Sequence, residues 1–326
     1  MKIWYDACTG KHLRYGTSIG QRLRKSGHEF IFTTREHPDT IQLAKILGEK
    51  PIVIGKYNPS TLFSRLEESA QRVMQFSKLF KDNPPDIAIA HQSVELCRTA
   101  FGLGIPIILT ADTPYATAVN RLTIPFAHTV VVSEALPKHF LKDHCAKNIV
   151  IFKGVDEVAW TKNFKPSKIN GLKKPLIVIR QVEVKAAYAK GEQDLAESIT
   201  DKLAKLGNVE FIQRYNHHGK TFEAKEAFVD SASLVANADL VVSYGGTIAR
   251  EAALQGVPSI AISDMAKTYV NQYLAQKGFP LFITTEQGVI EYAEKYLGKR
   301  FDVHSELERL EDPVDVIEKV VDSLRI

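Results

Sequence analysis

Short apolar runs alternate with longer amphipathic segments along the whole chain, and this alternation predicts βαβ units with parallel sheets. In the first half, each run has the length of one strand and each segment has the length of one helix. The expected strands are Lys2–Tyr5, Glu29–Thr34, Pro51–Ile54, Asp86–Ala90, Pro106–Thr110 and Thr129–Val132. The expected helices are Gly16–Lys25, Thr40–Leu47, Thr61–Lys81, Val94–Phe101, Tyr115–Leu122 and Pro137–His144.

The longest of these expected helices carries an apolar stripe. Its members are Leu62, Leu66, Val73, Phe76 and Phe80. Because residues three and four apart share one face of a helix, we interpret the stripe as the face that packs against the core.

A polar stretch, Trp160–Lys174, predicts a linker, and a second alternation of strands and helices follows it. The expected strands are Leu176–Ile179, Glu210–Arg214, Leu240–Ser243, Ser259–Ile262 and Leu281–Thr284. The expected helices are Asp194–Leu206, Ser231–Ala236, Ile248–Gln255, Val270–Lys277, Val289–Leu297 and a final amphipathic helix, Pro313–Arg325. We therefore expect two doubly wound, Rossmann-like α/β domains, residues 1–165 and 166–326. Their ligands should lie at the C-terminal strand ends, in a central cleft.

The composition is that of an ordinary globular protein, with 44% apolar and 25% charged residues among 326. No run approaches the roughly 18 apolar residues that a membrane span needs, and the first residues lack the features of a signal peptide. The three cysteines are widely separated and form no metal-binding spacing. We therefore expect a cytoplasmic protein without a bound metal ion. The dinucleotide and P-loop motifs are also missing from the sequence.

The charge is unevenly divided between the two halves. A formal net charge of +4 is too small to indicate nucleic acid as a partner. Residues 1–165 hold 22 basic and 15 acidic residues, a net of +7, whereas residues 166–326 hold 20 and 23, a net of −3. We expect the first half to meet an anionic or lipid-linked acceptor, or to contact the inner face of a membrane peripherally.

The segment from Ser243 to Thr247 is the most informative loop. An apolar strand runs into Ser243, then into Gly245, Gly246 and Thr247, and a helix follows directly. Glycines let backbone N–H groups approach a ligand, and a helix N-terminus favours anions, so the loop suits a phosphate or diphosphate. A tight turn without a ligand is the alternative. Glu251, one turn into the helix, is expected to be free to bind ribose hydroxyls, or else to be a surface carboxylate near the helix start.

The segment Asp239–Pro258 resembles the nucleotide-sugar-binding segment of GT-B glycosyltransferases and of the related sugar-nucleotide 2-epimerases. The run Thr9-Gly10-Lys11-His12 and the following Gly16–Phe30 resemble the glycine-rich first loop, helix and second strand of those enzymes. The whole chain most resembles a largely archaeal GT-B-like family of unknown function, with Ala111–Pro114 and Asn120–Ala127 as further similar stretches. This resemblance implies a GT-B-like fold and a nucleotide-diphospho-sugar as donor.

Two departures from the resembled enzymes narrow the reaction. The second acidic residue of retaining GT-B enzymes would fall on Ser259, which disfavours a retaining mechanism. The epimerases carry a Gly-Asp pair after their fourth strand, where this chain has Ala90-His91-Gln92-Ser93 and no carboxylate. The first departure thus favours an inverting over a retaining transfer, and the second favours transfer over epimerisation.

Candidate catalytic and binding residues lie at predicted strand ends. The resemblance makes His12 the first candidate for the catalytic base, and Asp112 is the alternative base or a group that positions the acceptor. Gly10 and His91 flank the same edge. Arg180 and Arg214 end two strands of the second half and could contact the diphosphate, or form ordinary ion pairs instead.

Three functions follow from these observations. The first is a metal-independent, inverting glycosyltransferase that uses a nucleotide-diphospho-sugar. The second is a sugar-nucleotide 2-epimerase. The third is a nucleotide-sugar-binding protein that has kept the fold and lost the chemistry.

Overall fold

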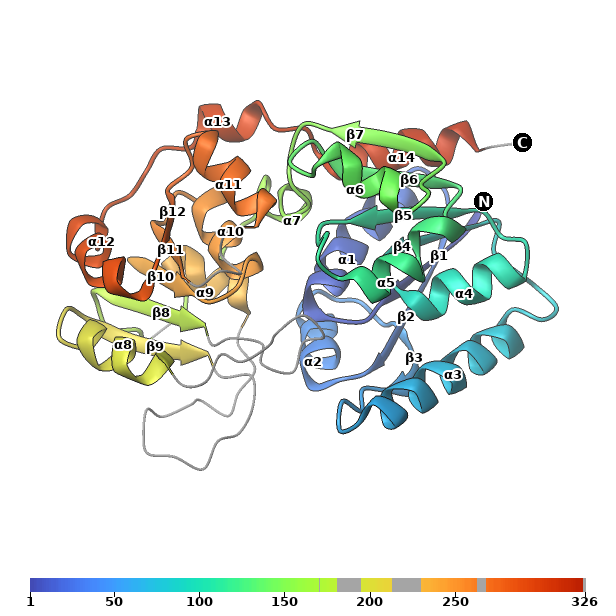
Figure 1. Ribbon diagram of the computed structural model, residues 1–326, viewed down its shortest axis with the longest axis horizontal. Coiled ribbons are helices and arrows are strands. Elements are labelled where there is room, and N and C mark those ends of the chain that lie inside the picture. Colours follow the sequence, from blue (N-terminus) through green and yellow to red (C-terminus); the bar gives the residue numbers. More distant parts are fainter. Residues whose placement is uncertain (170, 181–194, 213–229, 263–267, 325–326) are drawn as a thin grey trace. The chain divides into compact units, whose positions relative to one another are not determined.

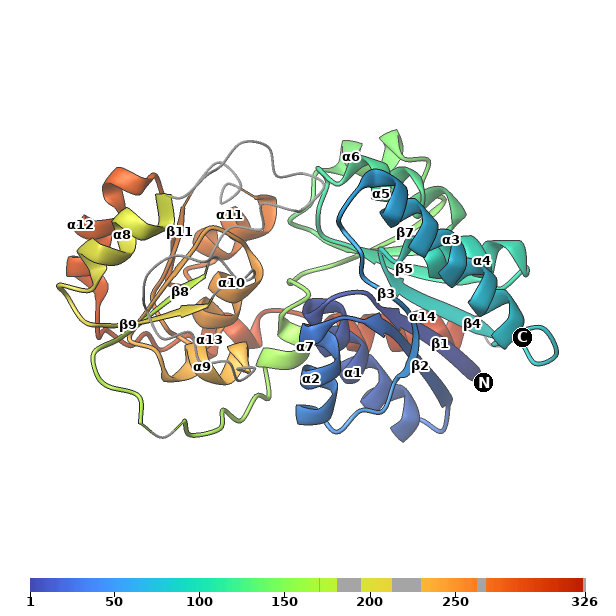
Figure 2. The same ribbon diagram turned by 90° about the horizontal axis from the view of Figure 1, so that it is seen from below.

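The computed structural model describes residues 1–169, 171–180, 195–212, 230–262 and 268–324 (Figures 1 and 2). The chain divides into two compact units. The first unit is Met1–Trp160 together with Glu311–Ile326, and the second unit is Thr161–Leu310. No helix within these described ranges is long and apolar enough to cross a membrane.

The first unit is built on a seven-stranded parallel sheet with the strand order β3-β2-β1-β4-β5-β6-β7. Its strands are β1 (Lys2–Ala7), β2 (Glu29–Glu36), β3 (Ile52–Lys56), β4 (Ile87–His91), β5 (Ile107–Ala111), β6 (Thr129–Ser133) and β7 (Asn148–Phe152). The chain reverses its direction of progress between β1 and β4. In open α/β sheets such a switch point, at the C-terminal strand ends, is where ligands bind.

Helices lie against this sheet and connect its strands. They are α1 (Gly10–Lys25), α2 (Pro38–Ile46), α3 (Leu62–Leu79), α4 (Val94–Gly102), α5 (Thr117–Arg121), η1 (Ile124–Phe126), α6 (Lys138–Asp143), α7 (Val158–Thr161) and α14 (Pro313–Ser323). Helix α1 starts six residues before the predicted position, because Thr9 caps it by accepting a hydrogen bond from the His12 backbone N–H. Gly16 lets α1 approach β1, since a Cβ there would lie 2.4 Å from the Tyr5 ring.

Strand β7 was not among the predicted strands, although the Ile149–Phe152 run carries a strand signal. It pairs with β6 at the edge of the sheet, and Ile149 and Ile151 stay 39% and 49% exposed. Every strand predicted from the sequence overlaps an observed strand. The alternation therefore predicted the sheet correctly, apart from this edge strand.

The predicted core-facing stripe of α3 is wrong in its first half. Leu62 and Leu66 are 83% and 69% exposed, whereas Phe76 and Phe80 are buried against the Trp4 ring at centroid distances of 4.8 and 4.6 Å. The inner face is continued towards the N-terminus of the helix by two charged residues, Glu68 and Arg72, rather than by leucines. The hydrophobic period alone could not show this, because ion pairing decides which face of the helix is buried.

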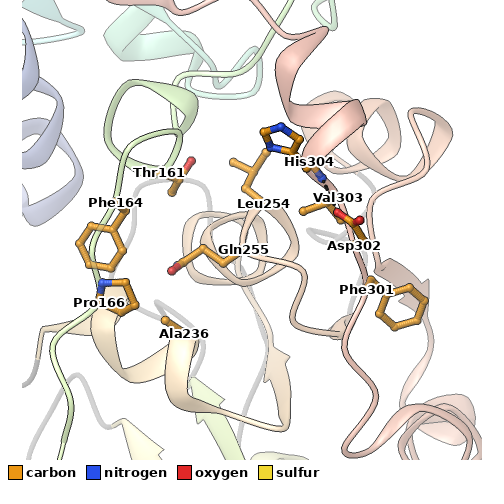
Figure 3. A pocket seen from close by; sticks show the side chains of 10 residues that line it. All are labelled: Thr161, Phe164, Pro166, Ala236, Leu254, Gln255, Phe301, Asp302, Val303 and His304. Atoms are coloured by element: carbon orange, nitrogen blue, oxygen red, sulfur yellow. Dashed lines mark hydrogen bonds between the residues drawn. The ribbon is translucent and has the colours of Figure 1, made fainter.

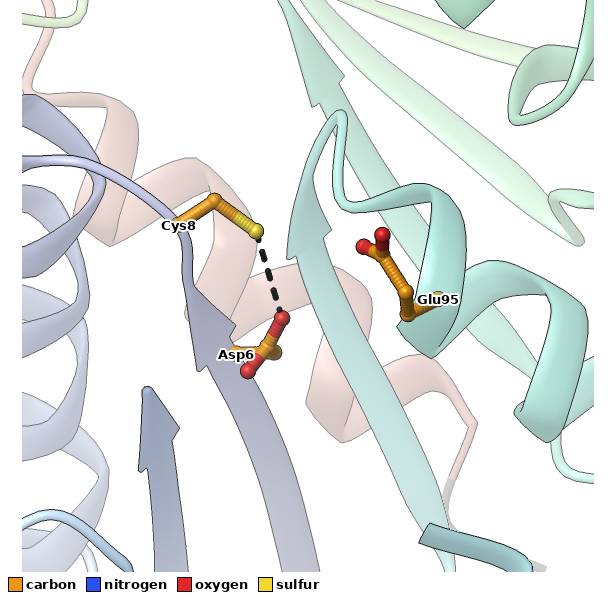
Figure 4. A group of neighbouring side chains, drawn as sticks. All are labelled: Asp6, Cys8 and Glu95. Atoms are coloured by element: carbon orange, nitrogen blue, oxygen red, sulfur yellow. Dashed lines mark hydrogen bonds between the residues drawn. The ribbon is translucent and has the colours of Figure 1, made fainter. Parts of the chain in front are cut away.

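Arg72 lies in a buried ionic cluster at the ends of β1 and α4. Its guanidinium is 2.8 Å from the Asp6 carboxylate and 3.2 Å from the Glu95 carboxylate. Asp6 also accepts hydrogen bonds from Thr33 and Ser93 at 2.8 and 2.7 Å. Figure 4 shows Asp6 and Cys8 at the end of β1 and Glu95 on α4. Burial alone would lower the pKa of Arg72, but the Asp6 carboxylate raises it, so the guanidinium stays charged.

The second unit has a five-stranded parallel sheet with the order β12-β11-β10-β8-β9. The strands are β8 (Leu176–Arg180), β9 (Asn208–Ile212), β10 (Leu240–Ser243), β11 (Ser259–Ile262) and β12 (Leu281–Thr284). The helices are α8 (Leu195–Leu203), α9 (Ser231–Asn237), α10 (Thr247–Leu254), α11 (Tyr269–Gln276), η3 (Glu286–Gly288), α12 (Val289–Tyr296) and α13 (His304–Glu308). Alternate residues of β8 and β10 belong to two separate apolar clusters, so both faces of the sheet are covered.

The C-terminal helix belongs to the first unit, which corrects its expected place in the domain of residues 166–326. The predicted apolar face of α14 is buried, with Ile317 and Val321 fully covered. Arg22 of α1 forms ion pairs with Asp315 and with Glu318 of α14, the latter at 3.0 Å. An amphipathic helix packs wherever a complementary surface lies, and here α1 offers both the apolar surface and the cation.

We expect Arg72→Met to destabilise the first unit strongly. The substitution leaves the Asp6 and Glu95 carboxylates in a buried place without their cation, which costs about 3–5 kcal/mol. Chemical denaturation followed by circular dichroism measures this loss. The matched control is Arg98→Met, at an exposed position of α4, for which a change in unfolding free energy within about 0.5 kcal/mol is expected. Equal stability of the two variants would contradict a structural role for the cluster.

Candidate functional site

The switch point of the first sheet gathers the predicted residues of the N-terminal half. Helix α1, directly after β1, carries Gly10, Lys11 and His12 in its first turn. Strand β4 ends at His91, and Asp112 follows β5. Because these strands are parallel and adjacent, their C-terminal ends meet at one edge, and the structure brings the predicted Gly10, His12, His91 and Asp112 together there.

Lys11 is the centre of a buried network of charges. Its ammonium nitrogen lies 2.5 Å from Asp112 Oδ2, 3.0 Å from Asp156 Oδ2 and 3.6 Å from Glu157 Oε1. The Lys11 and Asp112 side chains are 11% and 13% exposed, whereas those of Asp156 and Glu157 are almost fully buried. Three carboxylates therefore surround one ammonium at this edge of the sheet.

His91 is oriented by hydrogen bonds within this network. His91 Nδ1 forms a 2.8 Å hydrogen bond with the Thr110 hydroxyl, and the tautomer of the ring decides which of the two groups donates. The Nε2 atom lies 3.6 Å from Asp112 Oδ1 and 3.9 Å from Asp156 Oδ2. The second ring nitrogen of His91 therefore faces two carboxylates.

The tautomer of His12 is set by a backbone hydrogen bond. The Cys8 backbone N–H donates to His12 Nδ1 at 3.4 Å, so the neutral ring carries its proton on Nε2. The ring stands edge-on to His91, with centroids 4.8 Å apart. Burial holds the pKa of His12 well below its usual value, and the neighbouring His91 and Lys11 act in the same direction. His12 therefore stays neutral near pH 7, with an N–H group to offer rather than a free lone pair.

Two groups of described side chains bring potential metal-ligating atoms within 4.8 Å of one another. In the group of His91, Asp112 and Asp156, the Lys11 ammonium already forms ion pairs with both carboxylates. In the group of Asp6, Cys8 and Glu95, Arg72 takes the same role. Burial, with help from Asp6, also raises the pKa of Cys8 to about 12, so the thiol stays protonated and is a poor ligand. In both groups, the carboxylates are therefore already paired with a cationic side chain of the protein.

The switch point of the second sheet lies between β8 and β10, and there Ser243 stands beside Arg180 in register. The Gly245 N–H donates to Ser243 Oγ at 3.0 Å, which closes the turn before α10. Gly246 is the N-cap of α10, and no side chain caps this helix. A Cβ on Gly246 would lie 2.3 Å from the Arg250 guanidinium, which packs under the loop. The start of α10 thus presents backbone N–H groups rather than a capping side chain, which suits the binding of an anion.

Glu251 is not the free carboxylate that the sequence predicts. It is 1% exposed and accepts a hydrogen bond from Ser231 Oγ at 3.2 Å, because α9 packs against its face of α10. Its role towards a ribose stays a prediction. Arg214 lies outside the described residues. Arg180, Ser243, Gly245, Gly246 and Thr247 share one edge of the second sheet, as expected from their places at strand ends.

Asp156, Glu157 and Lys11 are members of the cluster that the sequence reasoning missed. The two acids follow β7, and without that strand their position at the C-terminal edge of the sheet could not be recognised. The Ile149–Phe152 run was the available signal. Lys11 lies within the Thr9–His12 motif. A lysine in a sequence does not indicate which distant carboxylates surround it, so its three partners could not be predicted.

The second unit also has a hollow of about 390 Å³, which none of the predicted site residues lines (Figure 3). It lies at the C-terminal end of α10, the end opposite the Ser243–Thr247 loop. Its lining residues are Thr161, Phe164, Pro166, Ala236, Leu254, Gln255, Phe301, Asp302, Val303 and His304. This hollow is therefore separate from the loop that suits a diphosphate.

The two parallel α/β sheets define a protein of the GT-B fold, as solved structures confirm over nearly the whole chain. MnaA of S. aureus with UDP has a TM-score of 0.69 and 14% identity, covering 99% of this chain and 96% of that one. The UDP-GlcNAc 2-epimerase of Methanocaldococcus jannaschii has a TM-score of 0.66 and 14% identity, covering 99% and 100%. The spinosyn forosaminyltransferase SpnP has a TM-score of 0.62 and 13% identity, covering 100% of both chains.

The chain belongs to the family described as "Protein of unknown function (DUF354)", which matches residues 1–325. The uncharacterized protein MJ0665 of Methanocaldococcus jannaschii is 31% identical over 344 residues, covering 100% of this chain and 99% of that protein. The resemblance to a GT-B-like family of unknown function, inferred from sequence motifs, is thereby confirmed.

We expect His12 to remain neutral across the range in which an ordinary histidine titrates. A depressed pKa in the folded state contributes stability that is present above the unfolded value of 6.5 and is lost as the pH falls through the folded value. The unfolding free energy of the native protein should therefore fall as the pH decreases below about 6.5, and His12→Gln should remove part of this slope. Denaturant titrations at several pH values measure this dependence of the unfolding free energy on pH.

The exposed His139 provides the control, since His139→Gln should keep the native slope. Nitrogen-15 chemical shifts of the histidine rings give a second measurement, because they distinguish the two tautomers. A His12 ring that titrates near pH 6.5, or that carries its proton on Nδ1, would contradict the assignment.

Proposed function

We propose that this protein is a metal-independent, inverting glycosyltransferase that moves a sugar from a nucleotide-diphospho-sugar to an acceptor hydroxyl. The observation that carries the proposal is the Lys11–Asp112–His91 network at the switch point of the first sheet. In this network Asp112 is a proton acceptor, His91 is a buried imidazole beside it, and Lys11 is the counter-ion of the carboxylate. The GT-B fold supports the nucleotide-sugar class of substrate, since solved neighbours include a co-structure with UDP and one with UDP-GlcNAc.

The second unit is proposed to hold the donor. The start of α10 at Gly246 and Thr247 offers backbone N–H groups and the positive end of the helix dipole to the diphosphate. Arg180, beside Ser243, adds a cation that can make a bidentate contact. These groups stabilise the negative charge that develops on the leaving nucleoside diphosphate, so they favour the transition state over the bound donor.

The first unit is proposed to hold the acceptor and its base. The acceptor oxygen attacks the anomeric carbon as the bond to the diphosphate oxygen breaks. The hydroxyl proton passes to Asp112, the more exposed carboxylate, and then to His91 Nε2 behind it. The resulting imidazolium lies between Asp112 and Asp156, which stabilise its charge. His12 was the first candidate for the base, but its Nε2–H fits better as a donor that orients the acceptor.

The inverting outcome is supported by Ser259. A retaining GT-B enzyme of the resembled type would carry its second acidic residue at this position. Ser259 is fully buried at the start of β11 and donates its hydroxyl to the Ala249 carbonyl at 2.9 Å. A single displacement, which inverts the anomeric carbon, needs no such acid.

The acceptor is proposed to be anionic or lipid-linked, and the transfer to occur at the inner face of a membrane. The net charge of +7 on residues 1–165 supports this choice. The excess positive charge lies outside the Lys11 network, because that network is itself negative. The hydroxyl of the acceptor therefore meets the acidic network, and its anionic part lies elsewhere on the first unit.

Epimerisation at C2 is a second candidate, because His91, Asp112 and Asp156 form a set of acid and base groups near one point. The two reactions differ in solvent exchange. Incubation of UDP-N-acetylglucosamine in D₂O gives deuterium at C2 when the C2 proton is removed and replaced. Deuterium at C2 would favour epimerisation, and its absence under conditions of measured binding would remove that candidate.

We expect at least one nucleotide-diphospho-sugar from a panel of UDP-, GDP- and dTDP-linked sugars to bind and to raise the melting temperature. Arg180→Met should weaken this binding by about tenfold, the loss of one charge-assisted contact. The matched control in the same unit is the exposed Arg309→Met, which should bind like the native protein. Calorimetry measures the affinities, and failure of the entire panel would refute the donor class.

We expect Asp112→Asn to lower kcat by about 10²–10⁴-fold and to leave the donor affinity unchanged. The amide can still pair with its neighbours but cannot accept the hydroxyl proton. Asp82→Asn, at an exposed position of the same unit, is the control. Unchanged turnover in Asp112→Asn would exclude Asp112 as the proton acceptor. Tight donor binding without turnover in the native protein would favour a binding protein that has lost the chemistry.

A further inference from the structure

Helix α3 exposes an apolar face. Leu62, Phe63, Leu66 and Met74 are 83%, 73%, 69% and 59% exposed, and we call these four residues the α3 outer face. At 100° per residue they fall within about one third of the helix circumference. Ala70 and Ser77, also exposed, lie in the same sector, so no charged side chain interrupts it. Single exposed apolar residues are ordinary, but a contiguous face marks a binding surface.

The amphipathic pattern of α3 is inverted relative to that of an ordinary surface helix. Its buried face carries Glu68 and Arg72, and Arg72 is fixed by Asp6 and Glu95. The helix therefore cannot rotate to bury the α3 outer face without breaking a buried ion pair. The apolar residues are held towards the outside by the same contacts that stabilise the fold.

The α3 outer face begins at the same edge of the first sheet as the candidate site. Helix α3 packs on β3, the edge strand of the sheet, as both views show (Figures 1 and 2). Since α3 follows β3, its N-terminal turns with Leu62, Phe63 and Leu66 stand at the C-terminal edge of the sheet. This is the edge that also carries Lys11 and Asp112.

The surroundings of the α3 outer face are basic. Residues 50–81 contain six Lys and Arg and two Glu, and the acids of the cluster already neutralise Arg72. On the helical wheel Glu67 and then Lys78 follow the face on one side, and Arg65 lies beyond the buried Phe76 on the other. Lys78 and Lys81 are exposed, and Lys56 is 60% exposed beside Glu68. A second copy would bring two basic rims together, whereas an anionic surface complements them.

We propose that the α3 outer face docks the protein on a membrane that contains anionic lipids. The helix lies in the plane of the interface, with Leu62, Phe63 and Leu66 inserted at the boundary of headgroups and acyl chains. Arg65, Lys78 and their basic neighbours attract the lipid phosphates. This surface goes beyond the proposed transfer reaction. Its link to the reaction rests on the proposed function, which places the transfer at a membrane. Membrane binding is measured without donor or acceptor, so its failure would remove the membrane location and leave donor binding and transfer to be tested separately.

The test is co-sedimentation of the full chain with vesicles of phosphatidylcholine, with and without phosphatidylglycerol. We expect binding to the anionic vesicles that weakens with salt. The triple variant Leu62→Ser, Phe63→Ser, Leu66→Ser should lower the partition coefficient at least about tenfold. Its melting temperature should be unchanged, because the three side chains are exposed. The matched control replaces Phe101, Leu103 and Leu122, also exposed in the first unit, by serine and should bind normally.

A spectroscopic readout tests insertion directly. In Phe63→Trp the new indole is exposed, whereas Trp4 and Trp160 are buried and report little change. We expect its emission to shift to the blue on anionic vesicles. Equal vesicle binding by both triple variants, or no vesicle binding by the native chain, would overturn the proposal. If light scattering shows a dimer that the Leu62, Phe63 and Leu66 substitutions dissociate, the face is instead an interface between copies.

Discussion

The buried ion pairs of Arg72 with Asp6 and Glu95 constrain much of the first unit. They join α3 to the end of β1 and to α4, three elements that are far apart in the sequence. Directly beyond Asp6, β1 leads to Cys8 and to the cap of α1, whose first turn presents Lys11 and His12. The same contact that fixes the inner face of α3 thus also supports the strand end on which the candidate site is built.

A second buried network, centred on Lys11, has a different physical character. In the Arg72 cluster the hydrogen bonds of Asp6 are satisfied by protein partners, which suits a structural role. Around Lys11, three carboxylates surround one ammonium, and His91 Nε2 faces two of them. Carboxylates beside an imidazole, with Asp112 partly exposed, suit a place where a proton is received. This contrast separates the two clusters, although both consist of buried ion pairs.

Much of the fold could be predicted from the sequence, because strands and helices of a doubly wound domain leave local signals. The apolar runs at β1, β4, β5 and β10 are such signals, and the candidate residues at their ends share sheet edges as expected. Long-range partners leave no comparable signal. Glu251 stood at the expected helical position, but its hydrogen bond with Ser231 depends on how α9 packs on α10. Asp156 and Glu157 joined the cluster only through β7, an edge strand that the sequence reasoning did not recognise.

The sequence by itself determined the alternation of strands and helices, the loops at the two switch points and the uneven distribution of charge. Each of these depends on residues that are neighbours in the chain. The tertiary structure alone decided that Arg72, rather than Leu66, faces inwards, that α14 returns to the first unit, and that Lys11 meets three carboxylates. Those outcomes depend on contacts between residues that are far apart in the sequence, such as Arg72 with Asp6 and Lys11 with Asp112. The attraction between such charges becomes significant only when the folded sheet brings them within a few ångströms.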